Sequence, residues 1–113
     1  MHELAIVEGI IDAAVPEAKK HGAKRILVIN LKIGELSGVI PECIQEYFTI
    51  AAQGSIAEGA KLSVERVPAT ILCNSCGYDG ALGKRRRRCP QCESTDFKLT
   101  GGREYFVESL EVE

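Results

Sequence analysis

The sequence predicts an α+β (α/β-like) fold in which a small sheet of about three strands carries two helices. A separate module with four cysteines is inserted between two of the strands. Three observations support this prediction. Apolar residues recur at helical spacing near the amino terminus, a dense run of β-forming residues occupies 25–33, and two Cys-x-x-Cys pairs lie between 73 and 92. With 113 residues, the chain is expected to form one domain, or one domain with a small satellite.

Two amphipathic helices are expected. The first runs from Leu4 to about Lys20, and its apolar residues recur in steps of three and four. Pro16 lies within it, so this helix is expected either to kink or to stop just before the proline and restart, while Gly22 closes it in the left-handed conformation. The second begins at Pro41, because proline favours the first helical position. The predicted buried faces are Leu4, Val7, Ile10, Ile11, Ala14, Val15 and Ala18 in the first helix, and Ile44, Tyr47, Phe48 and Ala51 in the second.

Three strands are expected in the main sheet. The run Arg25–Ile33 has too few polar residues for a solvated face, which predicts a central, covered strand. A second strand is expected around Leu62–Val67 and a third at Tyr105–Val112. Because the cysteine pairs fall between the last two, we expect one domain formed by residues 1–68 and 104–113, and a second, inserted domain formed by residues 69–103.

The four paired cysteines are the strongest functional signal. Cys73 and Cys76 form one pair, Cys89 and Cys92 form the other, and twelve residues separate them. The two-residue spacer allows both thiolates of one turn to bind the same ion, and a short hairpin brings the second turn over the first. Four sulfur ligands suit a closed tetrahedral Zn²⁺ site of the zinc-ribbon (rubredoxin-like) type. Such a site is structural, because it leaves no open position for a substrate.

Other uses of these cysteines were weighed. Two disulfides are less compatible with a chain that has no apolar signal segment, since thiols stay reduced in the cytosol, where we expect this protein. A redox-active motif needs one pair only. Iron in a rubredoxin-type site uses the same geometry, and the spacing does not separate it from zinc. About 35 residues cannot form a sufficient apolar core, so residues 69–103 are expected to depend on a metal for folding.

Charge is distributed unevenly along the chain. The net charge is −2, but residues 69–103 carry +4 and the remainder carries −6. The basic run Lys84–Arg88 is compatible with a solvated hairpin tip, with a docking surface for an acidic partner, or with contact to nucleic acid. No apolar run is long enough for a membrane span. No nucleophile–base pair, carboxylate dyad or phosphate-binding glycine loop is present, so the protein is not expected to be an enzyme.

The chain begins Met1-His2-Glu3, which offers a second kind of metal site. The Met1 amine, the His2 amide nitrogen and the His2 imidazole can close two adjacent chelate rings around one ion. The Glu3 amide or an outside donor would complete a square plane, an arrangement that favours Ni²⁺ or Cu²⁺ over Zn²⁺. The alternative is a solvated terminal histidine without a role.

Three elements together resemble the HypA/HybF family: Met1-His2-Glu3-Leu4 before a helix, the segment KIGELSGV at 32–39, and the paired Cys-x-x-Cys insert. Proteins of that family are nickel metallochaperones for [NiFe] hydrogenase maturation. The resemblance covers nearly the whole chain and preserves the order of the three elements.

The resemblance implies nickel at Met1, His2 and Glu3, with His2 as the side-chain ligand and Glu42 as an acidic candidate nearby. It implies zinc at the four paired cysteines, bound by sulfur alone, because His2 and His21 are the only histidines. The implied function is delivery of Ni²⁺ to the hydrogenase large-subunit precursor with a HypB-type GTPase, and the family also serves urease in some organisms, which would add urease accessory proteins. The alternative is a zinc-ribbon adaptor that binds nucleic acid or protein through residues 84–88.

Overall fold

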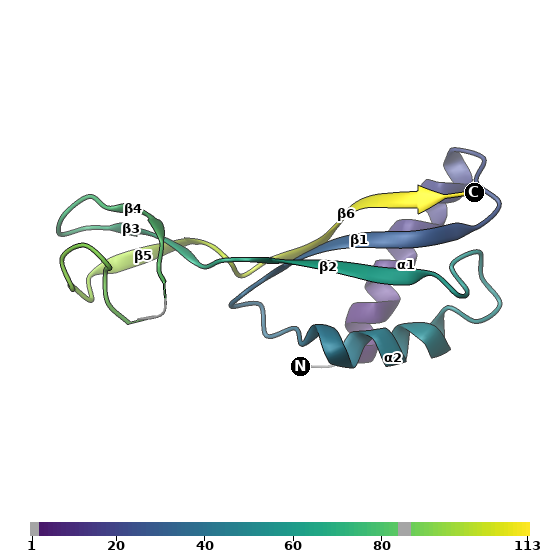
Figure 1. The fold of residues 1–113 in the computed structure, drawn as a ribbon, viewed down its shortest axis with the longest axis horizontal. Coiled ribbons are helices and arrows are strands. Elements are labelled where there is room, and N and C mark those ends of the chain that lie inside the picture. The colour runs from purple at the N-terminus through teal and green to yellow at the C-terminus, as the bar shows by residue number, and fades with distance from the viewer. Residues whose placement is uncertain (1–2, 84–86) are drawn as a thin grey trace.

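The computed structural model describes residues 3–83 and 87–113. These residues form an elongated molecule of 52 × 26 × 16 Å with one three-stranded sheet at each end of the long axis (Figure 1). The elements are α1 (Glu3–Lys20), β1 (Ile26–Gly34), α2 (Pro41–Ala51), β2 (Lys61–Val67), β3 (Thr70–Cys73), β4 (Asp79–Ala81), β5 (Phe97–Gly101) and β6 (Tyr105–Val112). The predicted two helices and three-stranded main sheet are confirmed, and β3, β4 and β5 form a second sheet between β2 and β6 in the chain.

Helix α1 runs through Pro16 without interruption, so the prediction of a helix that stops and restarts is wrong. Pro16 lies on the exposed face, where water can satisfy the carbonyl that loses its hydrogen bond. The predicted glycine cap is confirmed: Gly22 has φ +76°, and the N–H of Ala23 reaches back to Ala18 over 3.0 Å. Within the described ranges, neither helix combines the length and apolar character needed to cross a bilayer.

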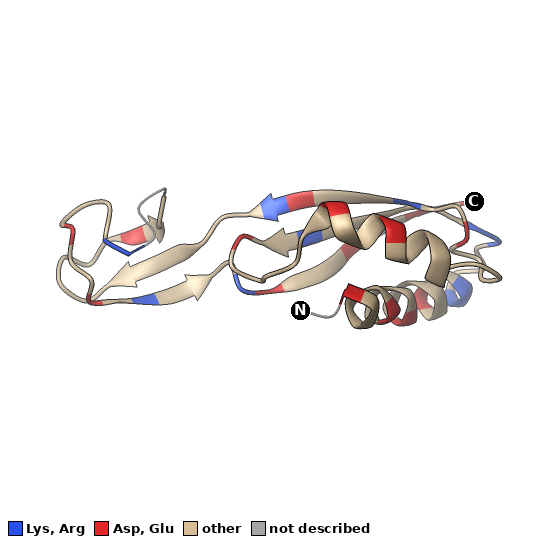
Figure 2. Cartoon of the chain, turned by 90° about the horizontal axis from the view of Figure 1, so that it is seen from below, with Lys and Arg blue, Asp and Glu red and all other residues tan. Residues whose placement is uncertain are grey.

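Strand β1 is the centre of the main sheet, whose order is β2-β1-β6. It pairs in parallel with β2 and antiparallel with β6. Its side chains at Ile29, Leu31 and Ile33 are buried, whereas Asn30 and Lys32 on the opposite face are only half-buried. The expectation of a fully covered strand is therefore met on one face alone, because both helices pack on the same side of the sheet (Figures 1 and 2).

Helix α2 buries a narrower face than predicted. Ile44 and Phe48 are fully buried, but Tyr47 is 44% exposed. Consecutive residues of a helix are about 100° apart around its axis, which turns Tyr47 away from the line that passes through Ile44 and Phe48. Pro41 occupies the first helical position, as predicted.

The second sheet has the order β4-β3-β5 and a small core. Five residues are buried there, namely Ala69, Ile71, Cys73, Leu82 and Cys89. Tyr78, Phe97 and Leu99 pack around them. Two of the five are members of the predicted metal site, so the apolar core and the cysteine cluster of this sheet are one structure.

The turn after β1 joins the two sheets. Three consecutive backbone N–H groups, at residues 34–36, donate hydrogen bonds of 2.7, 2.8 and 2.7 Å to the carbonyls of Glu104, Val67 and Gly102. The backbone N–H of Ala69 donates to the Glu35 carboxylate over 3.3 Å. The side chain of Leu36 packs against the core of the second sheet. The turn is thus bonded both to the end of β2 and to the segment between β5 and β6.

Two glycines permit this close approach. A Cβ at Gly34 would meet the backbone carbonyl of Gly102 and would lie 2.8 Å from the carbonyl oxygen of Glu104. A Cβ at Gly102, which has φ +97°, would lie 2.6 Å from the Cα of Ala69. Backbone atoms cannot move aside as a flexible side chain can, so the junction requires glycine at both positions.

We predict that Gly34→Ala destabilises the protein by about 3 kcal/mol, because the added methyl group meets backbone on two sides. Gly9→Ala is the matched control: it lies within α1 with no atom near its Cβ position, and it should stabilise by about 0.5–1 kcal/mol. Urea unfolding of both variants measures the difference. Equal stability of the two variants would contradict the described junction.

Candidate metal sites

The four paired cysteines converge at the far end of the second sheet. Their sulfur atoms all lie within 4.8 Å of one another. The Sγ atoms of Cys73 and Cys92 are 3.6 Å apart, as are those of Cys76 and Cys89. Four sulfurs about 2.3 Å from a central ion form a tetrahedron with edges of about 3.8 Å. The cluster therefore has the size and donor set of a four-sulfur metal site.

The two cysteine turns have the same backbone hydrogen-bond pattern. In each turn, the first cysteine accepts a hydrogen bond from the residue four positions later and donates one to the residue five positions later. In the first turn these are Gly77 to Cys73 (3.1 Å) and Cys73 to Tyr78 (2.8 Å). In the second they are Glu93 to Cys89 (2.9 Å) and Cys89 to Ser94 (2.8 Å). The turns are thus two copies of one motif that face each other across the cluster.

Both turns need a residue in the left-handed conformation directly after their second cysteine. Gly77 has φ +78° and Glu93 has φ +63°. Glycine adopts this conformation freely, whereas other residues incur a cost of about 1 kcal/mol or more. Gly77 could be anticipated from the sequence. The left-handed conformation of Glu93 could not be anticipated. The only signal in the sequence was its position directly after the second cysteine pair, which matches the position of Gly77 after the first.

Side chains hold the two turns together. The hydroxyls of Ser75 and Ser94 are hydrogen-bonded over 2.9 Å. Asn74 donates to the Asp96 carboxylate over 3.1 Å, and its backbone N–H donates to the carbonyl of Asp96 over 2.9 Å. These bonds fix the separation of the turns through groups other than the sulfurs.

The surroundings of Cys73, Cys76 and Cys92 give these three thiols different pKa values. The backbone N–H of Cys76 donates to the Cys73 sulfur and lowers the pKa of that thiol to about 7. At Cys92 the backbone N–H of Ser94 also lowers the pKa, but desolvation and the three neighbouring sulfurs outweigh it and raise the pKa to about 12. At Cys76 the backbone N–H of Tyr78 and the Cys92 thiol lower the pKa, but desolvation and the sulfurs of Cys89 and Cys73 outweigh them and raise it. Four adjacent thiolates thus need a cation to exist together.

The predicted amino-terminal site lies mostly outside the described residues. Met1 and His2 are not described, whereas Glu3 is the half-buried first residue of α1. Glu42 is exposed in the first turn of α2. The start of α1 and the start of α2 lie near each other in both views (Figures 1 and 2).

The other two candidate donors are placed elsewhere. His21 lies beyond the opposite end of α1 from Glu3, and its Nε2 is 3.1 Å from the Glu17 carboxylate. Cys43 is half-buried on α2, and the described cluster of potential metal ligands does not include it. Of the predicted ligands, the structure brings together the four paired cysteines.

A two-helix α+β domain joined to a four-sulfur cluster defines a small metal-binding accessory protein. The sequence matches the family described as "Hydrogenase/urease nickel incorporation, metallochaperone, hypA" over residues 1–112. The chain belongs to this HypA family of nickel metallochaperones for hydrogenase maturation. The predicted family is thereby confirmed, and since its members are metallochaperones, so is the prediction of a non-enzymatic protein.

Individual relatives agree with this assignment. The chain is 40% identical to "Hydrogenase maturation factor HypA 2" of Bradyrhizobium diazoefficiens, with 100% of both chains covered. It is 37% identical to "Hydrogenase maturation factor HypA" of Dehalococcoides mccartyi, over 100% of this chain and 95% of the relative. The fold is similar to the solution structure of the nickel metallochaperone HypA from Helicobacter pylori, with a TM-score of 0.71 and 24% identity over 99% of this chain and 97% of that one.

We predict that Zn²⁺ uptake by the cysteine cluster releases more protons at low pH than at high pH. Cys76 and Cys92 are protonated at about pH 8 and must lose their protons to bind metal. As pH falls through about 7, Cys73 also becomes protonated, so the apparent affinity falls more steeply. Calorimetric titrations in buffers of different ionisation enthalpy, at about pH 8 and about pH 6, count the released protons. An equal number of released protons at both pH values would contradict the described difference in pKa between the thiols.

We also predict that substitutions at the two left-handed positions affect metal affinity to different extents. Gly77→Ala places a side chain at φ +78° and should weaken metal binding about fivefold, equivalent to about 1 kcal/mol. Glu93→Gly relieves the left-handed conformation at the equivalent position and should weaken metal binding less than Gly77→Ala does. Competition with a chromophoric zinc chelator measures both. A similar loss in both variants would show that the left-handed conformation is not the cause.

Proposed function

We propose that this protein binds Ni(II) at its amino terminus and, with a HypB-type GTPase, delivers it to the large-subunit precursor of a [NiFe] hydrogenase. The observation that carries this proposal is the family match, which extends from residue 1 to residue 112 and so includes Met1-His2-Glu3. Nickel is the cargo in this function.

The chemistry of the terminus supports nickel as the ion. The Met1 amine, the His2 amide and the His2 imidazole are nitrogen donors that one ion can bind together, and nitrogen donors in a plane favour Ni²⁺ over Zn²⁺. Glu3 follows directly and begins α1, so its amide or carboxylate is close by along the chain. Transfer to a partner requires an ion that the partner can reach, which a buried four-ligand cage would not offer.

Glu42 is the acidic side chain that we propose as an additional or transient ligand. It lies in the first turn of α2 and is exposed. The start of that helix lies near the start of α1 (Figure 1). The Glu42 carboxylate could bind the Ni²⁺ ion as it leaves the amino-terminal nitrogens. This transient role does not require the carboxylate to be held in a fixed position before the ion arrives.

We propose Zn²⁺ as the occupant of Cys73, Cys76, Cys89 and Cys92, with a structural role. The sulfur spacing near 3.6 Å supports a tetrahedral ion of zinc size. Residues 69–103 would then form a zinc-binding domain, and residues 1–68 with 104–113 the nickel-binding domain. The small core of the second sheet supports this division, because metal binding would supply stability that five buried residues cannot.

The remaining proposals concern the cellular location of the protein and its further partners. We propose a cytoplasmic location, which free cysteines and a role in hydrogenase maturation support. Urease accessory proteins are a second group of partners where urease is present, in line with the family description. Nucleic acid is not proposed as a partner. Of the basic run, Arg87 and Arg88 are exposed, and residues 84–86 lie outside the described part of the chain.

We predict that His2→Ala abolishes the tight Ni²⁺ site, because the imidazole is the single side-chain nitrogen of the proposed chelate. His21→Ala is the control, since it removes the other histidine at the opposite end of α1 and should leave Ni²⁺ binding unchanged. Untagged, zinc-loaded protein is required, because an amino-terminal extension eliminates the Met1 amine. Calorimetry and ligand-field absorbance report the site. Unchanged binding in His2→Ala would overturn the nickel proposal and favour the adaptor function.

A further inference from the structure

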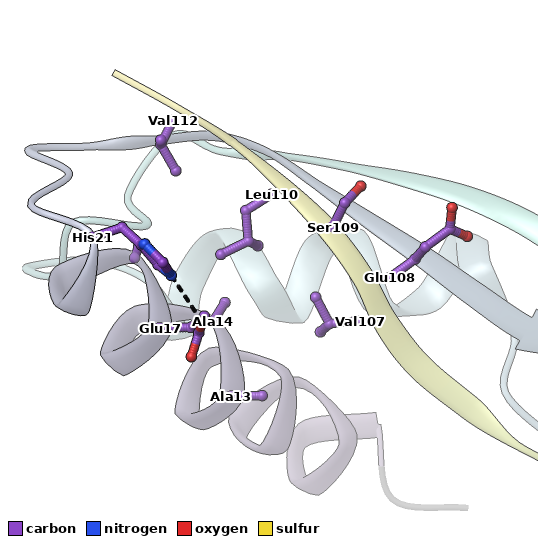
Figure 3. Close-up of a pocket in the computed structure, with 10 residues that line it drawn as sticks. Ala13, Ala14, Glu17, His21, Val107, Glu108, Ser109, Leu110 and Val112 are labelled. Carbon is purple, nitrogen blue, oxygen red and sulfur yellow. Dashed lines mark hydrogen bonds and ion pairs between the residues drawn. The ribbon is translucent and has the colours of Figure 1, made fainter.

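A groove runs between the second half of α1 and the outer edge of β6. Its volume is about 440 Å³, and its lining is mainly apolar, with Glu17, His21, Glu108 and Ser109 as the polar members. The lining includes Ala13, Ala14 and Ala18 from α1 and Val107, Leu110 and Val112 from β6. In Figure 3, Val107 and Leu110 point from β6 toward the helix, while Ser109 and Glu108 point away from it. The hydrogen-bonded pair of His21 and Glu17 closes one end.

The groove exists because the helix extends beyond the sheet. In the sheet order β2-β1-β6, strand β6 has a neighbour on one side only among residues 3–83 and 87–113. Ala13 and Ala14 have side chains too small to fill the space that a fourth strand would otherwise cover. The eight-residue strand therefore presents an unpaired backbone edge directly beside an apolar floor.

These two features fit one kind of occupant. An extended peptide segment that adds to the β6 edge would satisfy the unpaired backbone groups. Since side chains of a strand alternate between its faces, every second residue of that segment would enter the groove above the alanines. A helix or a compact ligand would leave the strand edge unpaired.

The charge around the groove selects among extended segments. Residues 104–113 include four glutamates and no lysine or arginine, and Glu17 lies on the opposite wall. Lys32 forms an ion pair with Glu108, and Arg25 forms one with Glu113. These two positive charges do not neutralise all of the glutamates around the groove. A second copy of this chain would bring its own four glutamates against the first set, and like charges on neighbouring strands are destabilising.

We propose that the β6 edge and the α1–β6 groove form a docking site for an extended segment of a partner protein in which apolar and basic residues alternate. The apolar residues fill the groove, and the basic residues face Glu108 and Glu111 on the outer face of the strand. The lining of the groove includes none of the proposed nickel or zinc ligands, so metal binding does not measure peptide binding there.

The test uses the full-length, zinc-loaded protein and a fluorescein-labelled nine-residue peptide that alternates lysine with valine or leucine. A peptide of the same composition, with its apolar residues placed consecutively, is the control for charge alone. We expect the alternating peptide to bind at least about tenfold more tightly, measured by fluorescence anisotropy, since only its register matches the groove. Raising the salt concentration should weaken this binding without abolishing it.

Two matched variants locate the site. Ala13→Leu fills the exposed wall of the groove and should weaken peptide binding about tenfold or more, whereas Ala5→Leu, an exposed position of the same helix outside the groove, should have no effect. Amide hydrogen exchange should show new protection along β6 when the alternating peptide is bound. Equal binding of both peptides, no effect of Ala13→Leu, or absence of binding would each overturn the proposal. A dimer of the free protein that Ala13→Leu disrupts would replace the partner segment by a second copy.

Discussion

The convergence of four sulfur atoms within 4.8 Å is the constraint on which the second sheet depends. Two of those cysteines, Cys73 and Cys89, are also part of its five-residue core, so the sheet cannot be packed without assembling the cluster. Leu36 packs against the same core, which extends the dependence to the turn after β1. That turn is hydrogen-bonded to the chain on either side of the second sheet, and so the placement of the two sheets relative to each other follows from the same packing.

Local patterns in the sequence predicted the elements well. Pro41 begins α2, Gly22 ends α1, and Tyr105–Val112 is a strand with the expected bounds, because each depends on residues near it in the chain. Features that depend on distant segments were not predictable in this way. One face of β1 is open because both helices pack on the same side of the sheet. Tyr47 is exposed because of the orientation in which α2 packs against that sheet.

The same distinction applies to the functional residues. Cysteine spacing predicted the cluster, because a two-residue spacer almost dictates the turn geometry. The left-handed conformation of Glu93 was not predictable, since nothing in a glutamate indicates it. The groove beside β6 was equally hidden: it is formed by alanines near residue 14 and by a strand more than ninety positions later, which only the fold brings together. The proposed nickel ligands Met1 and His2 rest on chain-end chemistry and on the family, and they lie outside the described residues.

The pairing of β1 with β6 has a consequence for biosynthesis. Asn30 and Ser109, bonded across these strands, are 79 positions apart, and Arg25 and Glu113 are 88 apart. The ribosome must therefore synthesise a long stretch of chain after β1 before the main sheet can acquire its third strand. The second sheet ends at Gly101, ahead of β6 in the chain, and pairs strands that are closer together in the sequence than β1 and β6 are. Long-range strand pairing is slow to form, so closure of the main sheet is expected to be the slower of the two steps.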